Sequence, residues 1–280
     1  MSTDSLAGKT VLVTGGARRL GRAIALTLAQ AGADVAITFR ASQSEAVETA
    51  AEIAATGRRS LAVPCDVRSE SSVHAAVAQV MAAFGKLDIL VNNAAVFSSA
   101  ALESMTLDQW DTVFETNTRG PFLVSREALP HLRATRGRVV NLGSLGGLRA
   151  WAGHAHYCAS KAALHMLTQA MAKAFAPDVS VNCVAPGWIQ VEVPSGSSVS
   201  GMPHPGSASA ESDLASIDSP SLATESDRRA ELQAARFAAK TPMGRNGEGQ
   251  DVAQAVLFFA TGPHFITGQT LVVDGGLGLS

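Results

Sequence analysis

The sequence contains few cysteines and no long apolar run. Cys65, Cys158 and Cys183 are far apart and form no CxxC pair, so neither a disulfide framework nor a thiolate metal site is indicated. No stretch approaches the roughly 18 consecutive apolar residues of a membrane span, and the first residues, MSTDSLAGK, lack the apolar segment of a secretory signal. We therefore expect a cytoplasmic protein that binds neither a membrane nor a metal ion.

An excess of charge is also missing. The net charge is −2 over 280 residues, and no long basic block supplies the electrostatic surface that binds nucleic acid. Hydrophobic residues make up 46% of the chain, which is enough for a sizeable core. Chemistry on a small molecule is therefore the expected class of function.

Short runs rich in Val, Ile and Leu alternate with alanine-rich segments of helical spacing. Strands buried on both faces have such continuous apolar runs, and their alternation with helices predicts a doubly wound, Rossmann-like α/β domain with a parallel sheet. The seven candidate strands lie in TVLVTG, DVAITF, SLAVPCDV, LDILVNNA, GRVVNLGS, VSVNCVAPG and QTLVVDGG. Because they are spread along the whole chain, we expect one domain over residues 1–280.

Residues 194–227 differ from this pattern. They include 11 serines among 34 residues and few large apolar side chains, so they cannot bury enough surface to offset the entropy of ordering. We expect a mobile insertion here, followed by a helix over residues 228–240 that ends before Pro242. The insertion follows the carboxyl end of a strand, which is where a lid over a substrate would lie. A spacer without function is the alternative.

The stretch TGGARRLG, residues 14–21, joins the first strand to the first helix. In a doubly wound sheet, this turn offers backbone N–H groups to a pyrophosphate. We expect Gly15 to permit the tight turn and Gly21 to let the helix approach the sheet. The spacing differs from GxGxxG, and Arg19 occupies a place where a small residue is usual.

The end of the second strand bears on the choice of cofactor. Enzymes of this architecture that use NAD place an acid there for the ribose hydroxyl, whereas a basic residue accommodates the 2′-phosphate of NADP. The sequence has Arg40 and Ser42 at this point and no carboxylate, and Arg18 can approach from the first turn. NADP(H) is therefore favoured over NAD(H).

The segment YCASK, residues 157–161, carries the strongest chemical signal. Tyr157 and Lys161 are four residues apart and share one face of a helix. A phenol has an ordinary pKa of about 10, and a neighbouring ammonium would lower it. Ser144 precedes Tyr157 by thirteen positions.

With these motifs in order, the chain resembles a short-chain dehydrogenase/reductase from end to end, apart from the serine-rich insertion. The matching pieces are TGGARRLG, CDV at 65–67, NNAA at 92–95, Asn117 in ETNTRG, Ser144, YCASK, APG at 185–187 and ITGQTLVVDGG. The resemblance implies that Tyr157 protonates a substrate carbonyl, Ser144 polarises its oxygen, and Lys161 holds the nicotinamide ribose while lowering the pKa of the tyrosine. Asn117 would support a proton-relay water.

The resemblance and the turn together give the expected cofactor contacts. These are Thr14, Gly15, Arg18, Arg19, Leu20, Gly21, Arg40, Ser42, Asp66, Val67, Asn92, Asn93, Ala94, Pro186, Gly187 and Ile189. The expected substrate pocket consists of Phe97, Leu145, Trp151 and Trp188. Val191 stands where the family often has threonine. The valine side chain cannot form the hydrogen bond that threonine would make with the nicotinamide carboxamide. His154 and His156 form H-x-H without a third ligand, so they are not expected to bind a metal.

Two substrates fit the resemblance. Serine at position 144 suits a ketone, as in 3-oxoacyl thioester reductases, and this is our leading expectation. Arg19 and Phe97 instead match pteridine reductases, in which the arginine faces substrate and cofactor phosphate and the phenylalanine stacks on the pterin. The connection at 176–182 also resembles bacterial members of that group, whereas its best-known members have an aspartate in place of Ser144.

Further alternatives are an alcohol or sugar dehydrogenase that uses NAD, and a regulatory protein that binds NADP without turnover. Intact Tyr157 and Lys161 favour an enzyme, because a binder needs no proton donor. The resemblance implies a homotetramer. Arginines that could receive an acidic acyl carrier protein stand at positions 126, 133, 136 and 138.

Overall fold

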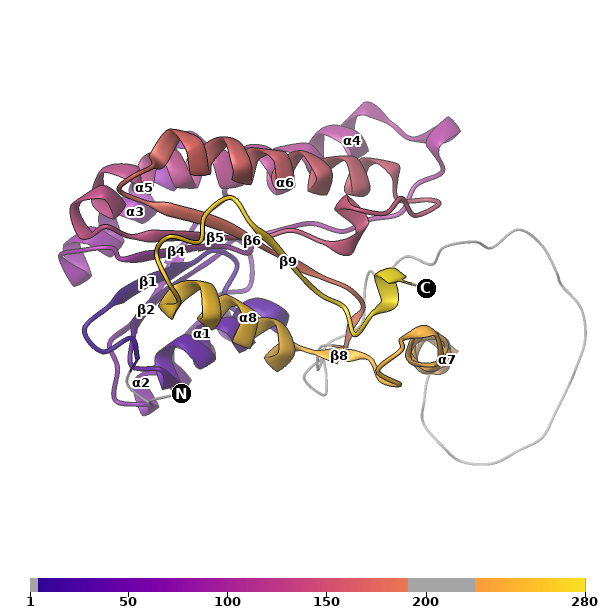
Figure 1. Cartoon of the computed structure of the whole chain (residues 1–280), viewed down its shortest axis with the longest axis horizontal. Helices are drawn as coiled ribbons and strands as arrows, with labels where there is room; N and C mark the ends of the chain where they lie inside the picture. The colour runs from indigo at the N-terminus through magenta and orange to yellow at the C-terminus, as the bar shows by residue number, and fades with distance from the viewer. Residues whose placement is uncertain (1–4, 191–224, 280) are drawn as a thin grey trace, which may run out of the picture.

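Seven parallel strands form the central sheet of the chain, of which the computed structural model describes residues 5–190 and 225–279. Their order is β3-β2-β1-β4-β5-β6-β9 (Figure 1). The strands are β1 (Thr10–Val13), β2 (Asp34–Phe39), β3 (Ser60–Pro64), β4 (Ile89–Asn92), β5 (Arg138–Leu142), β6 (Ser180–Pro186) and β9 (Thr270–Val273). All seven apolar runs expected to be strands form them, so the predicted doubly wound α/β fold is confirmed.

Helices cover both faces of the sheet (Figure 1). One face carries α1 (Arg19–Gln30), α2 (Gln43–Ala55) and α8 (Gly249–Thr261), and the other carries α3 (Glu70–Phe84), α5 (Gly120–Thr135) and α6 (Ala155–Phe175). Successive side chains of a strand point to opposite faces. Val11 and Val13 accordingly pack in the first core and Leu12 in the second, each at most 1% exposed. Burial on both faces explains why the strands are continuously apolar.

A smaller unit lies beyond the carboxyl end of β6. Here β7 (Ile189–Gln190) pairs with β8 (Gly247–Glu248), and α7 (Glu225–Lys240) lies nearby. The helix begins three residues before the expected residue 228 and ends at the expected Lys240. The indole of Trp188 stacks on the ring of Phe237, with centroids 4.1 Å apart, and joins α7 to this unit. Val191 and residues 194–224 of the expected insertion lie outside the described residues.

The strand order locates a crevice for a ligand. β1 pairs with β2 on one side and with β4 on the other, so the connections leave this point in opposite directions. In open α/β sheets, ligands bind outside the carboxyl ends of the strands at such a switch point. The segments that follow β1 and β4 begin at Thr14 and Asn93, and both belong to the motifs described above. Among the described helices, none is long and apolar enough to cross a membrane.

Candidate active site

The turn after β1 is held tightly against the segment after β4. The hydroxyl of Thr14 accepts hydrogen bonds from the backbone N–H groups of Asn93 at 3.0 Å and Ala94 at 3.1 Å. Gly15 has φ of +64°, as expected for the tight turn. A Cβ on Gly21 would lie 2.2 Å from the carbonyl oxygen of Gly15, so only glycine lets the helix approach so closely. The turn and the start of α1 are therefore built around two glycines with different tasks.

Arg19 adopts a backbone conformation that usually belongs to glycine. Its φ is +51°, although it is the first residue of α1. For a residue with a Cβ, this left-handed conformation costs about 1–2 kcal/mol, and such strain is concentrated at functional sites. The family's usual glycine would fit the backbone better. A favourable contact of the guanidinium therefore has to offset this cost, and the side chain lines the cavity described next.

A cavity of about 410 Å³ opens at the carboxyl edge beside this turn. That volume lies within the range of roughly 300–1,000 Å³ for small-molecule sites. Its lining includes eleven expected cofactor residues: Gly15, Arg18, Arg19, Leu20, Gly21, Arg40, Ser42, Asp66, Val67, Asn93 and Ala94. Its other lining residues include Cys65, Val96 and Thr116. The cavity combines a helix N-terminus with three arginines, and this donor set fits a phosphorylated dinucleotide.

Five other expected cofactor residues lie elsewhere. Thr14 is buried and acts through its hydrogen bonds to the backbone. The side-chain amide of Asn92 donates to Ser125 at 2.9 Å and to Asn141 at 2.8 Å, so it braces the interior between β4 and α5. The Asn92 side chain therefore does not line the cavity, and the expected contact of this residue with the cofactor stays a prediction. Side chains alternate along a strand, and Asn93, just beyond β4, reaches the cavity instead. The remaining three, Pro186, Gly187 and Ile189, follow or end β6 at the same edge of the sheet.

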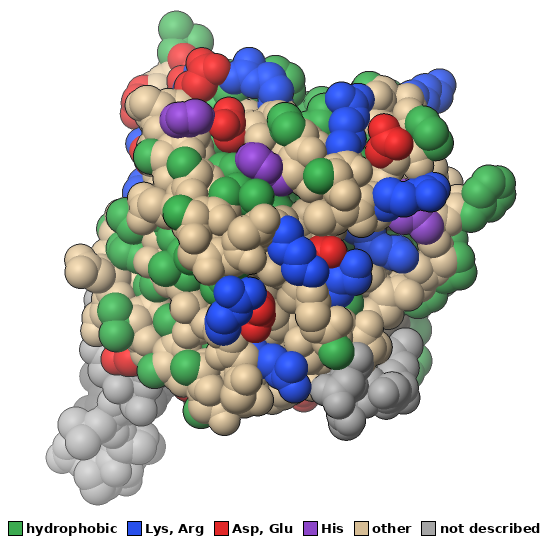
Figure 2. Space-filling model, turned by 90° about the vertical axis from the view of Figure 1, so that its left-hand side faces the viewer, with side chains coloured by type: hydrophobic (Ala, Val, Ile, Leu, Met, Phe, Trp, Pro, Cys, Tyr) green, Lys and Arg blue, Asp and Glu red, His purple; other side chains and the backbone are tan. Residues whose placement is uncertain are grey.

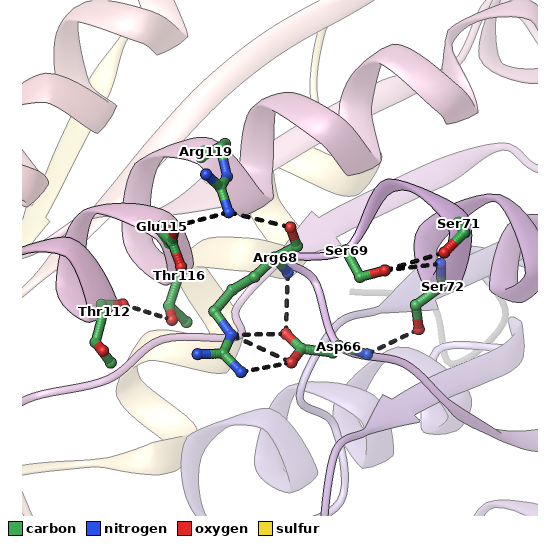
Figure 3. Close-up of polar contacts among 9 residues, drawn as sticks. All are labelled: Asp66, Arg68, Ser69, Ser71, Ser72, Thr112, Glu115, Thr116 and Arg119. Carbon is green, nitrogen blue, oxygen red and sulfur yellow. Dashed lines mark hydrogen bonds and ion pairs between the residues drawn. The ribbon is translucent and has the colours of Figure 1, made fainter. Parts of the chain in front are cut away.

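Asp66 lines the cavity and belongs to a polar network that extends to Glu115 and Arg119, just before α5 (Figure 3). Its carboxylate accepts several hydrogen bonds from the Arg68 side chain, the shortest at 2.7 Å, and these together lower the pKa of Asp66. Arg119 donates to the backbone oxygen of Arg68 at 3.3 Å and forms an ion pair with Glu115 at 3.0 Å. No motif or spacing in the sequence marks Arg68 as part of this network.

Asn117 connects the cavity with the candidate catalytic residues. It lies in a π-helical turn (Glu115–Arg119) between α4 (Leu107–Phe114) and α5, and such turns are frequent at functional sites. Its amide accepts from the Val96 N–H at 2.8 Å and donates to the Val96 carbonyl at 2.9 Å. It also donates to the hydroxyl of Ser160 on α6 at 3.1 Å. Because Val96 lines the cavity, Asn117 fixes the cavity wall to the helix that bears Tyr157.

Ser144, Tyr157 and Lys161 come together beyond β5. Ser144 follows the strand, and its side-chain oxygen accepts from the Gly146 N–H at 3.0 Å. Its hydroxyl also interacts with the Tyr157 side chain and lowers the pKa of the phenol. The ammonium nitrogen of Lys161 lies 5.9 Å from the centroid of the Tyr157 ring and donates to the carbonyl of Leu142 at 2.7 Å. The three expected groups thus meet at the carboxyl edge of the sheet.

Burial sets the protonation of these groups. It raises the pKa of Tyr157 to about 12, and the interaction with Ser144 offsets part of that rise. Burial also lowers the pKa of Lys161 to about 8. The net shift of the tyrosine is therefore opposite to the expected lowering by Lys161, because desolvation of the phenolate outweighs the influence of its neighbours. A phenol that keeps its proton at neutral pH is suited to donate it.

Tyr157 is the only tyrosine of the chain, so the absorbance of phenolate measures its pKa directly. We expect no substantial phenolate in the free protein up to about pH 10.5, because an unperturbed tyrosine titrates near 10 and this one near 12. The measurement is an alkaline difference spectrum, with the guanidinium-unfolded chain as the control that titrates near 10. Phenolate that forms at or below that value in the folded protein would contradict the burial argument.

Aromatic side chains surround Tyr157. The Phe97 ring meets it edge-on, with centroids 4.7 Å apart, and Trp151 lies nearly parallel at 6.2 Å. Phe97 also stacks on His154 at 4.7 Å, a partner that the sequence did not reveal. The structure thus places Phe97 and Trp151 against Tyr157. It places Trp188 against Phe237 of α7, and it buries Leu145 near Gly278.

The arginines considered for a carrier protein are spread over different parts of the surface. Arg138 begins β5, at the edge opposite to Tyr157, and Arg133 and Arg136 lie at the end of α5 close to it. Figure 2 shows the face opposite to α7 and the C-terminus, where lysine and arginine side chains gather around acidic ones. Arg126 forms an ion pair with Glu70. Within the described residues, no group of three His, Cys, Asp or Glu side chains could hold a metal ion.

Comparisons with known proteins agree with this geometry. The family model described as short chain dehydrogenase matches residues 9–198, and one described as Enoyl-(Acyl carrier protein) reductase matches residues 216–278. The chain is 34% identical to the 3-oxoacyl-[acyl-carrier-protein] reductase FabG of Staphylococcus aureus over 96% of this chain and 98% of that protein.

Solved structures give the same result. A short chain dehydrogenase from Burkholderia cenocepacia J2315 in complex with NADP is 36% identical, with a TM-score of 0.79 over 98% of this chain and 99% of that one. A short-chain dehydrogenase/reductase from Serratia marcescens is 33% identical, with a TM-score of 0.81 and the same coverage. The fold and the site define an oxidoreductase. The chain belongs to the short-chain dehydrogenase/reductase family.

Proposed function

We propose that the protein is an NADPH-dependent reductase that converts a ketone, such as a 3-oxoacyl thioester, to an alcohol. The observation that carries the proposal is the meeting of Ser144, a protonated Tyr157 and Lys161, next to a cavity with three arginines. A nicotinamide cofactor supplies a hydride when bound, so the protein must supply a proton and stabilise the developing oxyanion.

The residues divide this work. Tyr157 donates its proton to the substrate oxygen, and Ser144 donates a hydrogen bond to the same atom. Lys161 supplies positive charge and two further N–H donors beyond the one bound to Leu142. Asn117 holds the Val96 backbone in place against α6. Trp151 and Phe97 shield the tyrosine from water, which strengthens each of these interactions.

The preference for NADPH rests on charge. Arg18, Arg19 and Arg40 line the cavity, and β2 ends without a carboxylate. A guanidinium binds a phosphate through paired hydrogen bonds, whereas a 2′-hydroxyl gains little from it. The Burkholderia cenocepacia relative was solved with NADP, which supports the same assignment here.

Pterin reduction is the second candidate function. Arg19 is kept in a strained left-handed conformation at the cavity, and Phe97 presents an aromatic ring beside Tyr157. Both features suit a flat, polar substrate. The relatives named 3-oxoacyl reductases and the serine at position 144 support the ketone more strongly.

The deciding assay follows oxidation of NADPH, and of NADH in parallel, with acetoacetyl thioester or dihydrobiopterin as substrate. The variant is Arg19→Gly, which relieves the positive φ and is therefore expected to fold at least as well as the wild type. We expect thioester reduction with NADPH that survives this change within about tenfold, since a guanidinium to phosphate contact contributes about 1.5–3 kcal/mol at most and is shared by three arginines.

Pterin reduction that is lost in Arg19→Gly would instead make Arg19 a substrate ligand and overturn the leading choice. Faster turnover with NADH would favour an alcohol or sugar dehydrogenase, and tight binding of NADPH without turnover would favour a regulatory binder. The homotetramer, the acyl carrier protein as partner and the single-domain organisation stay predictions.

A further inference from the structure

His165 extends the catalytic face of α6 by one further turn. Tyr157, Lys161 and His165 follow each other at intervals of four, so they share one side of the helix. The imidazole is 6% exposed, and its Nε2 accepts a hydrogen bond from the backbone N–H of Ser144 at 3.3 Å. Since Nε2 accepts, the proton of the neutral ring lies on Nδ1. Within the described residues, that buried Nδ1 has no hydrogen-bond partner.

The chain leaves room for this contact at Gly143. A Cβ on Gly143 would lie 2.2 Å from Nε2 of His165 and 2.7 Å from the sulfur of Cys183. The glycine therefore admits the imidazole to the backbone at the end of β5, directly before the serine that contacts Tyr157. Buried polar atoms without partners are rare in native proteins and call for an explanation. A core position would be filled more favourably by leucine unless Nε2 served a purpose.

We propose that His165 is a positioning residue of the reductase: by accepting the Ser144 N–H, it fixes the backbone that aims the serine hydroxyl at Tyr157. This inference rests on the proposed function. It goes beyond it by adding a residue outside the serine, tyrosine, lysine and asparagine of the family motif.

The electrostatic surroundings support a neutral acceptor. Burial and the nearby charge of Lys161 lower the pKa of His165 to about 4, so Nε2 stays available for the Ser144 N–H at neutral pH. Cys183 of β6 packs against the same site, and its thiol, whose pKa burial raises to about 11, stays neutral. Lys161 is thus the charged group that faces the imidazole. A protonated His165 would lose the acceptor and repel Lys161.

The test compares His165→Leu with His165→Gln. Leucine fills similar space without an acceptor, whereas the side-chain amide of glutamine can place an oxygen where Nε2 lies. We expect His165→Leu to lower kcat for thioester reduction about tenfold or more, as a displaced catalytic group does, while the KM for NADPH stays within about twofold. His165→Gln should keep kcat within about threefold of the wild type. Two measurements need no turnover: amide hydrogen exchange at Ser144 should be faster in the leucine variant alone, and Tyr157 should titrate higher there.

Different results would overturn the inference. If His165→Leu keeps kcat, Ser144 exchange and the Tyr157 titration of the wild type, the contact has no role. If leucine and glutamine variants lose kcat equally, the effect is one of core packing. Should His165→Leu fail to fold, His165→Met, which is unbranched and also lacks a strong acceptor, replaces it. A wild type that reduces neither substrate refutes the proposed function, whereas Ser144 exchange and the Tyr157 titration still decide whether His165 holds the serine.

Discussion

Tyr157→Phe should lose about 10²–10⁴-fold in kcat, the usual contribution of a positioned acid, while it still binds NADPH. The phenol is protonated at neutral pH and lies beside Ser144 and Lys161, so it is the group of the site that is ready to donate. Phenylalanine keeps the ring contacts with Phe97 and Trp151, so the fold and the cavity should persist. Steady-state oxidation of NADPH measures kcat, and titration of cofactor fluorescence measures the Kd.

The matched control removes a buried hydroxyl elsewhere. Ser180→Ala acts on β6 at the amino edge of the sheet, where the hydroxyl oxygen has no hydrogen-bond partner among the residues that the structure describes. We expect this control to turn over at the rate of the wild type. If Tyr157→Phe retained more than about a tenth of the activity, another group would have to donate the proton, because the loss of a true acid is larger. If neither variant turned over substrate while both still bound NADPH, a regulatory protein that binds NADP would be favoured.

Gly21→Ala should damage both stability and cofactor binding. Its Cβ would lie 2.2 Å from the carbonyl oxygen of Gly15 and 2.6 Å from the side-chain nitrogen of Asn93. Overpacking of this kind costs about 1–3 kcal/mol. Relief by movement of α1 would displace its N-terminus from the cavity. We therefore expect a lower free energy of unfolding in denaturant. We also expect weaker NADPH binding, with Kd raised about tenfold for each 1.4 kcal/mol of binding free energy lost.

Gly57→Ala serves as the control for backbone strain. Gly57 has φ of +79°, and no atom of the described residues lies within 4 Å of the place that a Cβ would take, so alanine there adds strain without a clash. It should cost about 1 kcal/mol and leave the NADPH affinity unchanged. Equal affinities for NADPH in the two alanine variants would show that the close approach at Gly21 does not shape the cavity.

The sequence predicted those features that follow from local pattern. Continuous apolar runs marked all seven strands, because strands buried on both faces need them. The spacing of Tyr157 and Lys161 placed both on one face of a helix, and Ser144 joined them at the carboxyl edge as expected.

Other features depend on the three-dimensional environment and could not be predicted. The pKa of Tyr157 rises because the side chains packed around it in the folded chain remove water from the phenol. The side chain of Asn92 turns away from the cavity because it satisfies Ser125 and Asn141. The backbone oxygen of Arg68 accepts from the Arg119 side chain, and the His165 imidazole accepts from the Ser144 N–H; both partners are distant in sequence, so no motif records these contacts.

The hydrogen bonds between Thr14 and the segment after β4 have a consequence for the folding of the chain. Asn93 and Ala94 are 79 and 80 residues away along the chain, so the turn takes its final shape only after β1 and β4 have paired. Parallel strands joined over such separations assemble slowly. A dinucleotide held by this turn binds only chains that have completed the pairing, and by mass action it protects them from unfolding. The concentration of such a cofactor would therefore set the free energy of unfolding of the chain as well as its rate of turnover.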